Sequence, residues 1–213
     1  MILVDGDYFF DPAVAAYAAL RSAGQGPPLL LAAVGYGKAF GDPANRRGRD
    51  YTPTRTALEP SSGGANAFLA HLTGPLWAEL AGRYPLQMGV RTIAGHSLGG
   101  LFALAAVFQP RPFFSQALVG APSLWWGRRG FLRLVAKLRD QQANLPVRLF
   151  LGVGEDETPS MLGDLTLFER QLAKRPFAGL EVTSRRFPER THYNVLPDLF
   201  RAGLSTLFGP AGL

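Results

Sequence analysis

The chain has 213 residues, of which 47% are hydrophobic and 18% charged, so it can form one sizeable domain and is too apolar to be disordered. No run of about 18 uncharged apolar residues occurs, which argues against a membrane span. The absence of cysteine excludes disulfides and thiolate zinc sites. The net charge of +6 suits nucleic acid, a membrane surface or a small anion and does not choose among them.

In the first part of the chain, short apolar runs alternate with a helical pattern and then give way to a long irregular segment. The predicted elements are, in order, a strand over 1–4, a turn at Asp5-Gly6-Asp7, a helix over 12–22 with Pro12 first, a strand over 29–34, a turn at Gly35-Tyr36-Gly37 and a loop over 41–64. The loop is rich in glycine, proline, serine and arginine, and loops of this length are often functional.

The remainder of the chain continues the alternation of strands and helices. The predicted elements are a helix over 65–82 that Gly74-Pro75 should kink or split, strands over 90–94, 117–119, 147–153 and 180–187, and helices over 101–108, 127–142, 161–174 and 196–207. Regular alternation predicts an α/β fold, with a mostly parallel sheet and helices on both faces. Because neither a repeat nor a linker occurs, we expect one domain over 1–213.

Residues 95–99 read Gly-His-Ser-Leu-Gly and match the pattern G-x-S-x-G between a predicted strand and a predicted helix. This context is that of a nucleophile elbow, in which a sharp turn exposes the serine hydroxyl. Ser97 is therefore the candidate nucleophile, and the amide of Leu98 can donate to a developing oxyanion. The alternative is a glycine-rich turn that happens to contain a serine.

A serine hydroxyl needs a base, and the chain has three histidines. His96 adjoins Ser97 and should point away around the turn, and His71 lies in a helical segment before the elbow. His192 lies in a loop after the last predicted strand, which fits the chain order serine, acid, histidine of hydrolases with this motif. In isolation a loop histidine is more often a surface residue, but elimination favours His192 as the base.

Three consecutive carboxylates, Glu155, Asp156 and Glu157, follow the predicted strand over 147–153. A carboxylate at the end of this strand could orient the base. The position three residues after the glycine that ends the strand favours Glu157, and the other two remain close competitors. Glu189 is a weaker candidate, and a solvated acidic turn is the structural alternative for at least two of the three.

The second oxyanion donor should come from a loop that follows an earlier strand. The best placed groups are the backbone amides of Gly6 or Asp7, after the first predicted strand. The turn Gly35-Tyr36-Gly37, after the second, is the alternative.

With these residues in hand, the sequence resembles the putative esterase family of α/β hydrolases, and most closely its ferric-siderophore esterases of the enterobactin and salmochelin type. The matching segments are LVDGDYFF (3–10), VGYG (34–37), RRGRDYTPT (46–54), GGANAFLAHL (63–72), GHSLGGLFAL (95–104), APSLWW (121–126), VGEDE (153–157) and THY (191–193). The resemblance implies an α/β-hydrolase fold with Ser97 as nucleophile and His192 as base. It implies neither a metal nor an organic cofactor. Some members work with a weak or absent acid, which leaves Glu157 the least secure of the three.

The arginines of the 46–49 segment resemble those that face an anionic catecholate in the family. Arg46 and Arg47 are thus candidate substrate-binding residues, and a solvated loop is the alternative. Trp125 and Trp126 follow the strand over 117–119. We expect at least one of them to pack beneath the site, while the other walls the pocket and stacks on an aryl ring.

The chain departs from the family at its first residues. In the family roughly two further strands precede the LVDGD segment, which here begins at residue 3. We expect either a fold with these N-terminal strands missing or a start codon set too far downstream. Asp5 and Asp7 lie where a signal peptide would be apolar, which favours a cytoplasmic protein.

These patterns predict a serine esterase without cofactors that acts on a small-molecule ester. The leading substrate is a catecholate siderophore trilactone, with which the iron would arrive. The first alternative is a general carboxylesterase for small acyl or feruloyl-type esters, and the second is a non-catalytic binding protein on a degenerate hydrolase fold. Nucleic acid is disfavoured because no aromatic residues interleave with the basic ones, and no membrane partner is expected.

Overall fold

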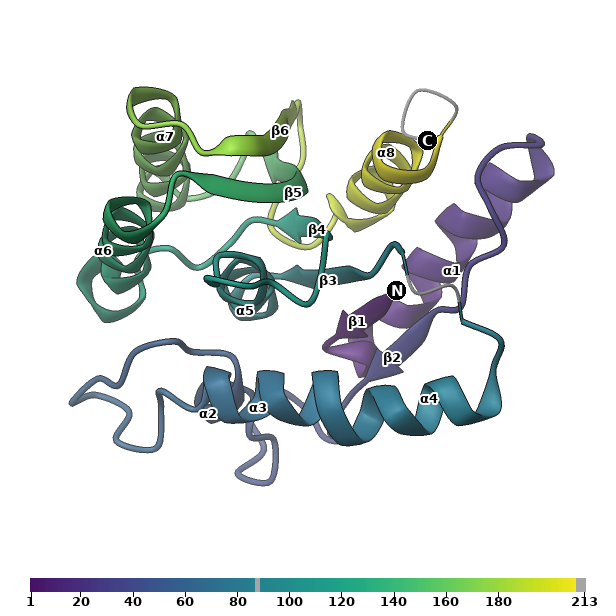
Figure 1. Cartoon of the computed structure of the whole chain (residues 1–213), viewed down its shortest axis with the longest axis horizontal. Helices are drawn as coiled ribbons and strands as arrows, with labels where there is room; N and C mark the ends of the chain where they lie inside the picture. The colour runs from purple at the N-terminus through teal and green to yellow at the C-terminus, as the bar shows by residue number, and fades with distance from the viewer. Residues whose placement is uncertain (87–88, 210–213) are drawn as a thin grey trace.

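The computed structural model describes residues 1–86 and 89–209, which are built around a six-stranded sheet (Figure 1). The spatial order of the strands is β2-β1-β3-β4-β5-β6, and every neighbouring pair is parallel. The strands are β1 (Ile2–Val4), β2 (Ala32–Val34), β3 (Thr92–His96), β4 (Gln116–Gly120), β5 (Asn144–Gly154) and β6 (Ala178–Phe187). The predicted mostly parallel sheet is confirmed.

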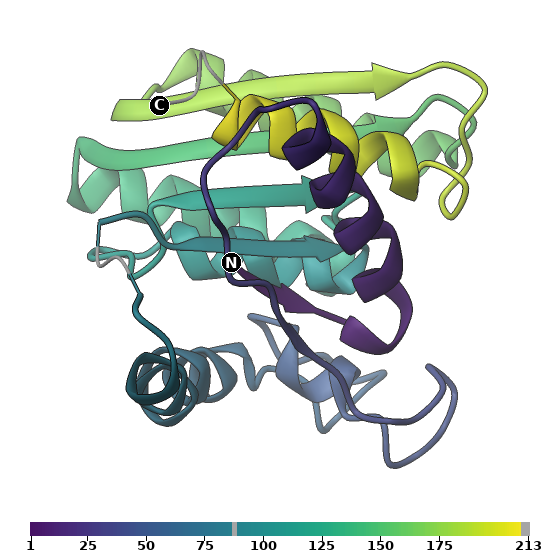
Figure 2. The same ribbon diagram turned by 90° about the vertical axis from the view of Figure 1, so that its right-hand side faces the viewer.

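Helices cover both faces of the sheet, as predicted. Helices α1 and α8 lie on one face and α5, α6 and α7 on the other (Figure 2). The helical elements are α1 (Gly6–Ser22), α2 (Arg47–Asp50), α3 (Ala65–His71), the π-helical turn η1 (Leu72–Leu76), α4 (Trp77–Arg83), α5 (Leu98–Val107), α6 (Trp126–Gln141), α7 (Pro159–Lys174) and α8 (Leu196–Phe208). We expected Gly74-Pro75 to kink or split the helix over 65–82. Instead, a π-helical turn that contains this pair leads from α3 directly into α4, with helical backbone angles at both joins, so the helix is not split.

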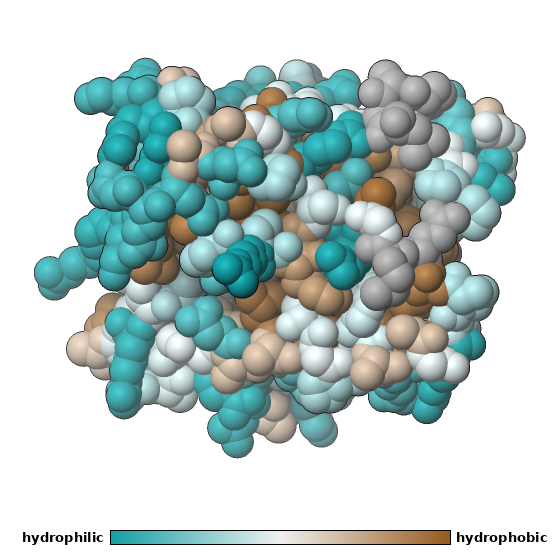
Figure 3. Space-filling view, viewed as in Figure 1, coloured by the Kyte–Doolittle hydropathy of each residue, from teal (hydrophilic) through white to brown (hydrophobic). Residues whose placement is uncertain are grey.

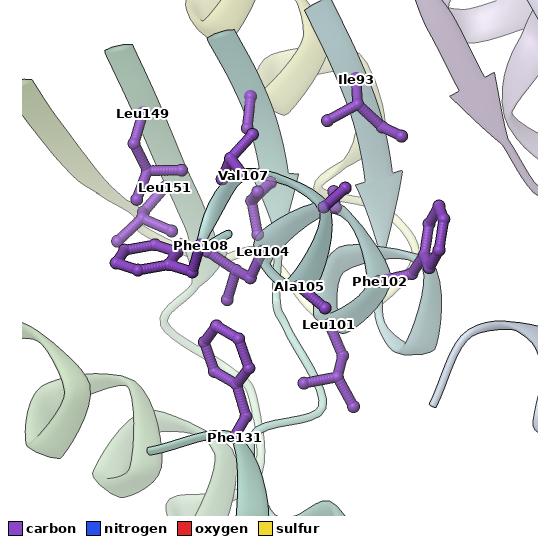
Figure 4. Packing of buried hydrophobic residues seen from close by; sticks show 14 of the residues in the cluster. Ile93, Leu101, Phe102, Leu104, Ala105, Val107, Phe108, Phe131, Leu149 and Leu151 are labelled. Atoms are coloured by element: carbon purple, nitrogen blue, oxygen red, sulfur yellow. The ribbon is translucent and has the colours of Figure 1, made fainter. Parts of the chain in front are cut away.

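The core consists of two apolar layers, one on each face of the sheet, because successive side chains of a strand point to opposite faces. In β4, Ala117 and Val119 pack toward α5, whereas Leu118 packs toward α8. Helix α5 lies centrally in the larger layer, where Leu104 and Phe108 meet side chains of β5 and α6 (Figure 4). Full burial of side chains of this size stabilises the fold by about 1.5–3 kcal/mol each.

Helix α1 begins six residues earlier than predicted. We expected a start at Pro12, but the helix begins at Gly6, directly after β1, and contains Pro12 in its interior. The early start buries Phe9 in the layer that α1 and α8 share. Tertiary burial therefore outweighs the preference of proline for the first position of a helix.

Strand lengths follow the available partners rather than the apolar runs. Only the last three residues of the predicted strand over 29–34 form β2, because its partner β1 has three residues. Strand β3 ends two residues later than predicted, at His96, since Gly95 and His96 pair with the end of β4.

The start of α6 also differs from the prediction of a regular helix over 127–142. Gly127, Arg128 and Arg129 adopt left-handed backbone angles, with φ of 56°, 55° and 61°. The guanidinium of Arg133 stabilises this turn by donating to the carbonyl oxygens of Gly127 and Arg128 at 3.1 and 2.6 Å.

Hydrophilic residues cover the surface over α6 and α7, whereas apolar residues are exposed toward the middle of the same face (Figure 3).

Within residues 1–86 and 89–209, no helix is both long and apolar enough to cross a bilayer.

The strand order places a topological switch point between β1 and β3. The chain leaves β1 toward one edge of the sheet and leaves β3 toward the other edge. In open parallel sheets, ligands bind in the crevice at the carboxyl ends of the strands at such a point. The segments that follow β1 and β3 begin with Asp5 and Ser97, so the predicted elbow lies at the switch point.

Candidate active site

Ser97 lies on a sharp turn between β3 and α5. Its backbone angles, φ 60° and ψ −121°, are unfavourable for a residue with a side chain and mark stored strain of the kind found at functional sites. The N–H of Ser97 donates to Gly120 O at 2.9 Å, and its carbonyl oxygen accepts from Leu101 and Ser123 at 3.0 Å each. A Cβ atom on Gly95 would overlap the carbonyl oxygen of Gly99, so the strand and the helix approach closely only because Gly95 has no side chain.

His192 is in contact with one carboxylate, that of Glu157. The distance between His192 Nδ1 and Glu157 Oε1 is 2.5 Å, and Glu157 is 8% exposed. This contact fixes Nδ1–H toward the acid and leaves Nε2 unprotonated in the neutral ring. Of the other predicted acids, Glu155 and Asp156 are exposed, as is Glu189.

The segments that carry the acid and the histidine are hydrogen-bonded to each other. The N–H of Glu155 donates to Phe187 O at 2.9 Å, and that of Asp156 donates to Arg190 O at 3.0 Å. A Cβ atom on Gly154 would overlap the carbonyl oxygen of Arg190, so the two backbones touch at this glycine. The competitors of Glu157 therefore contribute backbone N–H groups to the joint between the two loops.

The buried His96, which directly precedes Ser97, connects the elbow to the histidine loop. The rings of His96 and His192 have centroids 4.5 Å apart. In the described part of the chain, Ser97 Oγ is hydrogen-bonded to Ser123 Oγ, at 3.4 Å, rather than to the imidazole. Ser123 was not among the predicted site residues. The sequence feature that could have identified it is its position in the segment over 121–126, which resembles the esterase family.

His96 is 1% exposed, and burial lowers its pKa from 6.5 to about 3, with the nearby His192 contributing in the same direction. His96 is thus neutral in the folded protein at every pH above about 4. In the unfolded chain it takes up a proton below about pH 6.5.

We expect the free energy of unfolding to fall by up to about 1.4 kcal/mol per pH unit between pH 6 and 4 on account of His96, because only the unfolded state gains this proton. His96→Asn removes this contribution and should flatten the acid limb, whatever it does to stability at pH 7. Urea unfolding from pH 4 to 7 measures the effect, with His71→Asn, at an exposed histidine, as the control. An unchanged slope in His96→Asn would contradict it.

Two helices begin at the switch point. Leu98 begins α5, and Gly6 begins α1, and the first N–H groups of a helix have no partner within it. Gly99 lies next to the start of α1, since a Cβ atom there would be 2.9 Å from Asp5 Oδ2. The predicted oxyanion donors Gly6, Asp7 and Leu98 therefore lie at adjoining helix starts.

The alternative donors, in the turn Gly35-Tyr36-Gly37, have partners already. The carboxylate of Asp7 accepts from the N–H of Tyr36 at 2.7 Å and from that of Gly37 at 3.1 and 3.2 Å. These contacts favour the amides of Gly6 and Asp7 over those of the turn.

The two arginines predicted to bind substrate differ in their surroundings. Arg46 is exposed. Arg47 instead donates to both oxygens of Asp5, with Nε–Oδ1 at 2.9 Å and Nη2–Oδ2 at 2.7 Å. Its guanidinium lies over the ring of Phe40, 4.3 Å from the centroid. The partner of Arg47 is 42 residues away in sequence, so no local pattern predicts this pair.

The two tryptophans also differ. Trp126 is 7% exposed and donates from Nε1 to Thr54 O at 2.9 Å, so it packs the long loop against the start of α6. Trp125 is 47% exposed and lies two residues after Ser123. Trp126 is thus buried and Trp125 is available at the surface.

The sequence of the chain is similar to a described family and to several known proteins. The family model described as Putative esterase matches residues 3–193. The ferri-bacillibactin esterase BesA of Bacillus subtilis (strain 168) is 29% identical over an alignment of 202 residues that covers 87% of this chain and 69% of that protein. A siderophore triacetylfusarinine C esterase of Aspergillus fumigatus is 30% identical over 168 residues, covering 75% of this chain and 53% of that protein, so the chain spans about half of that relative.

Solved structures show the same fold. An IroE-like serine hydrolase from Shewanella oneidensis has a TM-score of 0.85 at 24% identity, covering 97% of this chain and 69% of that one. The BES protein from Bacillus cereus has a TM-score of 0.82 at 27% identity, covering 95% of this chain and 80% of that one. These likenesses confirm the predicted α/β-hydrolase-type fold.

Proposed function

Because the chain belongs to the Putative esterase family of α/β hydrolases, we propose that this ester hydrolase works through Ser97, His192 and Glu157. The observation that carries the proposal is the 2.5 Å contact of His192 with the buried Glu157. The ring of His192 also lies 4.5 Å, between centroids, from that of His96, the residue before the elbow serine. Acyl transfer by such a site needs a serine nucleophile, an imidazole that takes its proton and a carboxylate that orients the imidazole.

In the acylation step, Ser97 Oγ attacks the ester carbonyl carbon while His192 Nε2 takes the hydroxyl proton. The Glu157 carboxylate stabilises the resulting imidazolium through Nδ1–H. The intermediate then breaks its bond to the alcohol oxygen, which leaves with the proton from His192. The Ser97 hydroxyl must first turn from Ser123 toward the imidazole, and such bonds commonly tighten only when substrate is bound.

In the deacylation step, His192 takes a proton from water, and the resulting hydroxide attacks the acyl-enzyme. The acid product leaves, and Ser97 regains its proton. In both steps the negative oxygen of the tetrahedral intermediate accepts hydrogen bonds from the amide of Leu98 and from that of Gly6 or Asp7. Removing one such donor from an enzyme typically costs about 10²–10³ in kcat.

We further propose an iron-loaded catecholate siderophore lactone as the substrate. The names of the two relatives, a ferri-bacillibactin esterase and a siderophore triacetylfusarinine C esterase, support a siderophore ester. Arg46 is exposed and offers a cation to an anionic catecholate, and the exposed Trp125 offers an aromatic face. The guanidinium of Arg47 is occupied by Asp5, so Arg46 is the better candidate of the two.

The test compares the purified protein on a ferric tricatecholate trilactone, on its iron-free form and on p-nitrophenyl butyrate. We expect the highest kcat/KM on the ferric lactone. Chromatography of the linear products measures the hydrolysis of the lactones. Arg46→Gln should lose about tenfold or more on the lactone, as expected for a charged hydrogen bond, and far less on the neutral ester. Equal losses on both would remove Arg46 from the substrate site.

The substrate panel also separates the other functions. Hydrolysis of neutral esters alone would indicate a general carboxylesterase and overturn the siderophore assignment. Binding of the ferric lactone without hydrolysis of any ester would indicate a binding protein and overturn the esterase proposal.

A further inference from the structure

Asp5 occupies the position immediately before helix α1, where an aspartate commonly caps the helix by accepting from the second or third N–H. Here it makes no such bond. Its backbone is left-handed, with φ 55° and ψ 40°. The side chain is 1% exposed and points to another partner.

That partner is Arg47, which engages both carboxylate oxygens with the two-pronged geometry of a strong charged hydrogen-bond pair. Tyr51 supports the arrangement from two sides, since its hydroxyl accepts from the Asp5 N–H at 3.1 Å and its ring lies 5.6 Å from the guanidinium. On its other side, the guanidinium lies over Phe40. The carboxylate is therefore held by the long loop and not by the helix that it precedes.

The first four amides of α1 differ in whether they have a hydrogen-bond partner. The N–H groups of Tyr8 and Phe9 donate to the Asp5 carbonyl oxygen at 3.0 and 3.1 Å. For the amides of Gly6 and Asp7, no hydrogen bond is found within residues 1–86 and 89–209. These are the two amides to which the proposed mechanism assigns the oxyanion. Two carboxylates lie beside them in sequence: that of Asp7 accepts from the N–H groups of Tyr36 and Gly37, and that of Asp5 is held by Arg47.

We propose that Arg47 is a positioning residue that holds the Asp5 carboxylate away from the amides of Gly6 and Asp7 and so keeps them open to the oxyanion. This inference rests on the proposed esterase function and assigns Arg47 a role within it. A released carboxylate would be drawn to the start of α1, where backbone N–H groups attract negative charge. There it would occupy a donor and repel the tetrahedral oxyanion.

Arg47→Met should lower kcat on p-nitrophenyl butyrate by about 10²-fold, the typical cost of one lost oxyanion donor, with KM changed less than threefold. It should also weaken inhibition by phenylboronic acid, which forms an anionic tetrahedral adduct with a serine, by a similar factor. Arg129→Met is the matched control, because Arg129 holds another buried carboxylate, that of Asp164, at 2.7 Å. This control should alter stability without changing kcat.

The distinguishing variant is the double substitution Asp5→Gly with Arg47→Met. Glycine adopts the left-handed conformation of residue 5 without strain and carries no carboxylate. If Arg47 acts by sequestering the carboxylate, the double variant should recover kcat to within about fivefold of wild type. A merely structural salt bridge predicts that the double variant is as slow as Arg47→Met or slower.

Two results would overturn the inference: a folded Arg47→Met with wild-type kcat, or a double variant that shows no recovery. If Arg47→Met does not fold, Arg47→Lys, which keeps the charge and loses the two-pronged contact, must show the same selective loss of kcat and boronate affinity. If the wild-type protein shows no ester hydrolysis that depends on Ser97, the proposed function itself is overturned. This result is distinct from the two that overturn only the role of Arg47.

Discussion

Ser97→Ala should lower kcat for ester hydrolysis by at least about 10⁴-fold, because it removes the atom that forms the acyl-enzyme. Residual turnover, if measurable, should come from the oxyanion donors and from substrate binding alone. KM should change little, since the hydroxyl contributes chiefly to the transition state. Initial rates on p-nitrophenyl butyrate measure the loss, and circular dichroism and the Tm check that the variant is folded.

The neighbouring hydroxyl of Ser123 makes an independent check necessary, because it lies 3.4 Å from that of Ser97. A fluorophosphonate probe should label wild-type protein once, on the peptide that contains Ser97, and should not label Ser97→Ala. Mass spectrometry of the digested protein locates the label. A label on Ser123, or substantial activity in Ser97→Ala, would show that the nucleophile has been misassigned.

His192→Gln should lower kcat by about 10⁴-fold, because glutamine cannot take the proton of the serine hydroxyl. Glu157→Gln should cost about 10² or more, since the amide removes the charge that stabilises the imidazolium and disturbs the ring orientation. Glu155→Gln should have little effect, because that carboxylate is exposed and the hydrogen bond of Glu155 to Phe187 is made by its backbone N–H. Initial-rate kinetics at pH 8 measure the series.

The combination of Ser97→Ala and His192→Gln sharpens this expectation. Residues that act as one catalytic unit are non-additive, so the double variant should be no slower than Ser97→Ala alone. Additive losses would place His192 outside the unit. If Glu157→Gln retains full activity, the site works with serine and histidine alone; if Glu155→Gln is the slower variant, the acid has been assigned to the wrong carboxylate.

The elements that the sequence predicts best are those with local signals. The elbow at Ser97 requires a strand, a strained turn and a helix in direct succession, and each has its own pattern. The π-helical turn at Gly74-Pro75 likewise follows from the covalent structure of proline, which has no N–H for the regular helix ladder. By contrast, the early start of α1 depends on the burial of Phe9 between elements that are distant in sequence, which no local pattern encodes.

The site residues likewise divide into those that local sequence patterns predict and those that depend on contacts between distant segments. Glu157 and His192 follow from chain order and strand ends, although the choice among three adjacent acids needed the fold, since only one of them turns inward. The pairing of Arg47 with Asp5 was beyond sequence reasoning. A basic cluster in a polar loop fits either a ligand site or a solvated loop, and the partner that occupies Arg47 lies 42 residues away, directly after β1.

The backbone joint between the acid loop and the histidine loop has a consequence for engineering this scaffold. With Gly154 touching Arg190 and two N–H groups bridging the loops, neither segment can be exchanged alone without displacing the other. A graft from a related hydrolase that alters acyl preference would have to transplant both as a matched pair. Insertions are better accommodated in the 41–64 loop, outside the segment from Arg46 to Tyr51.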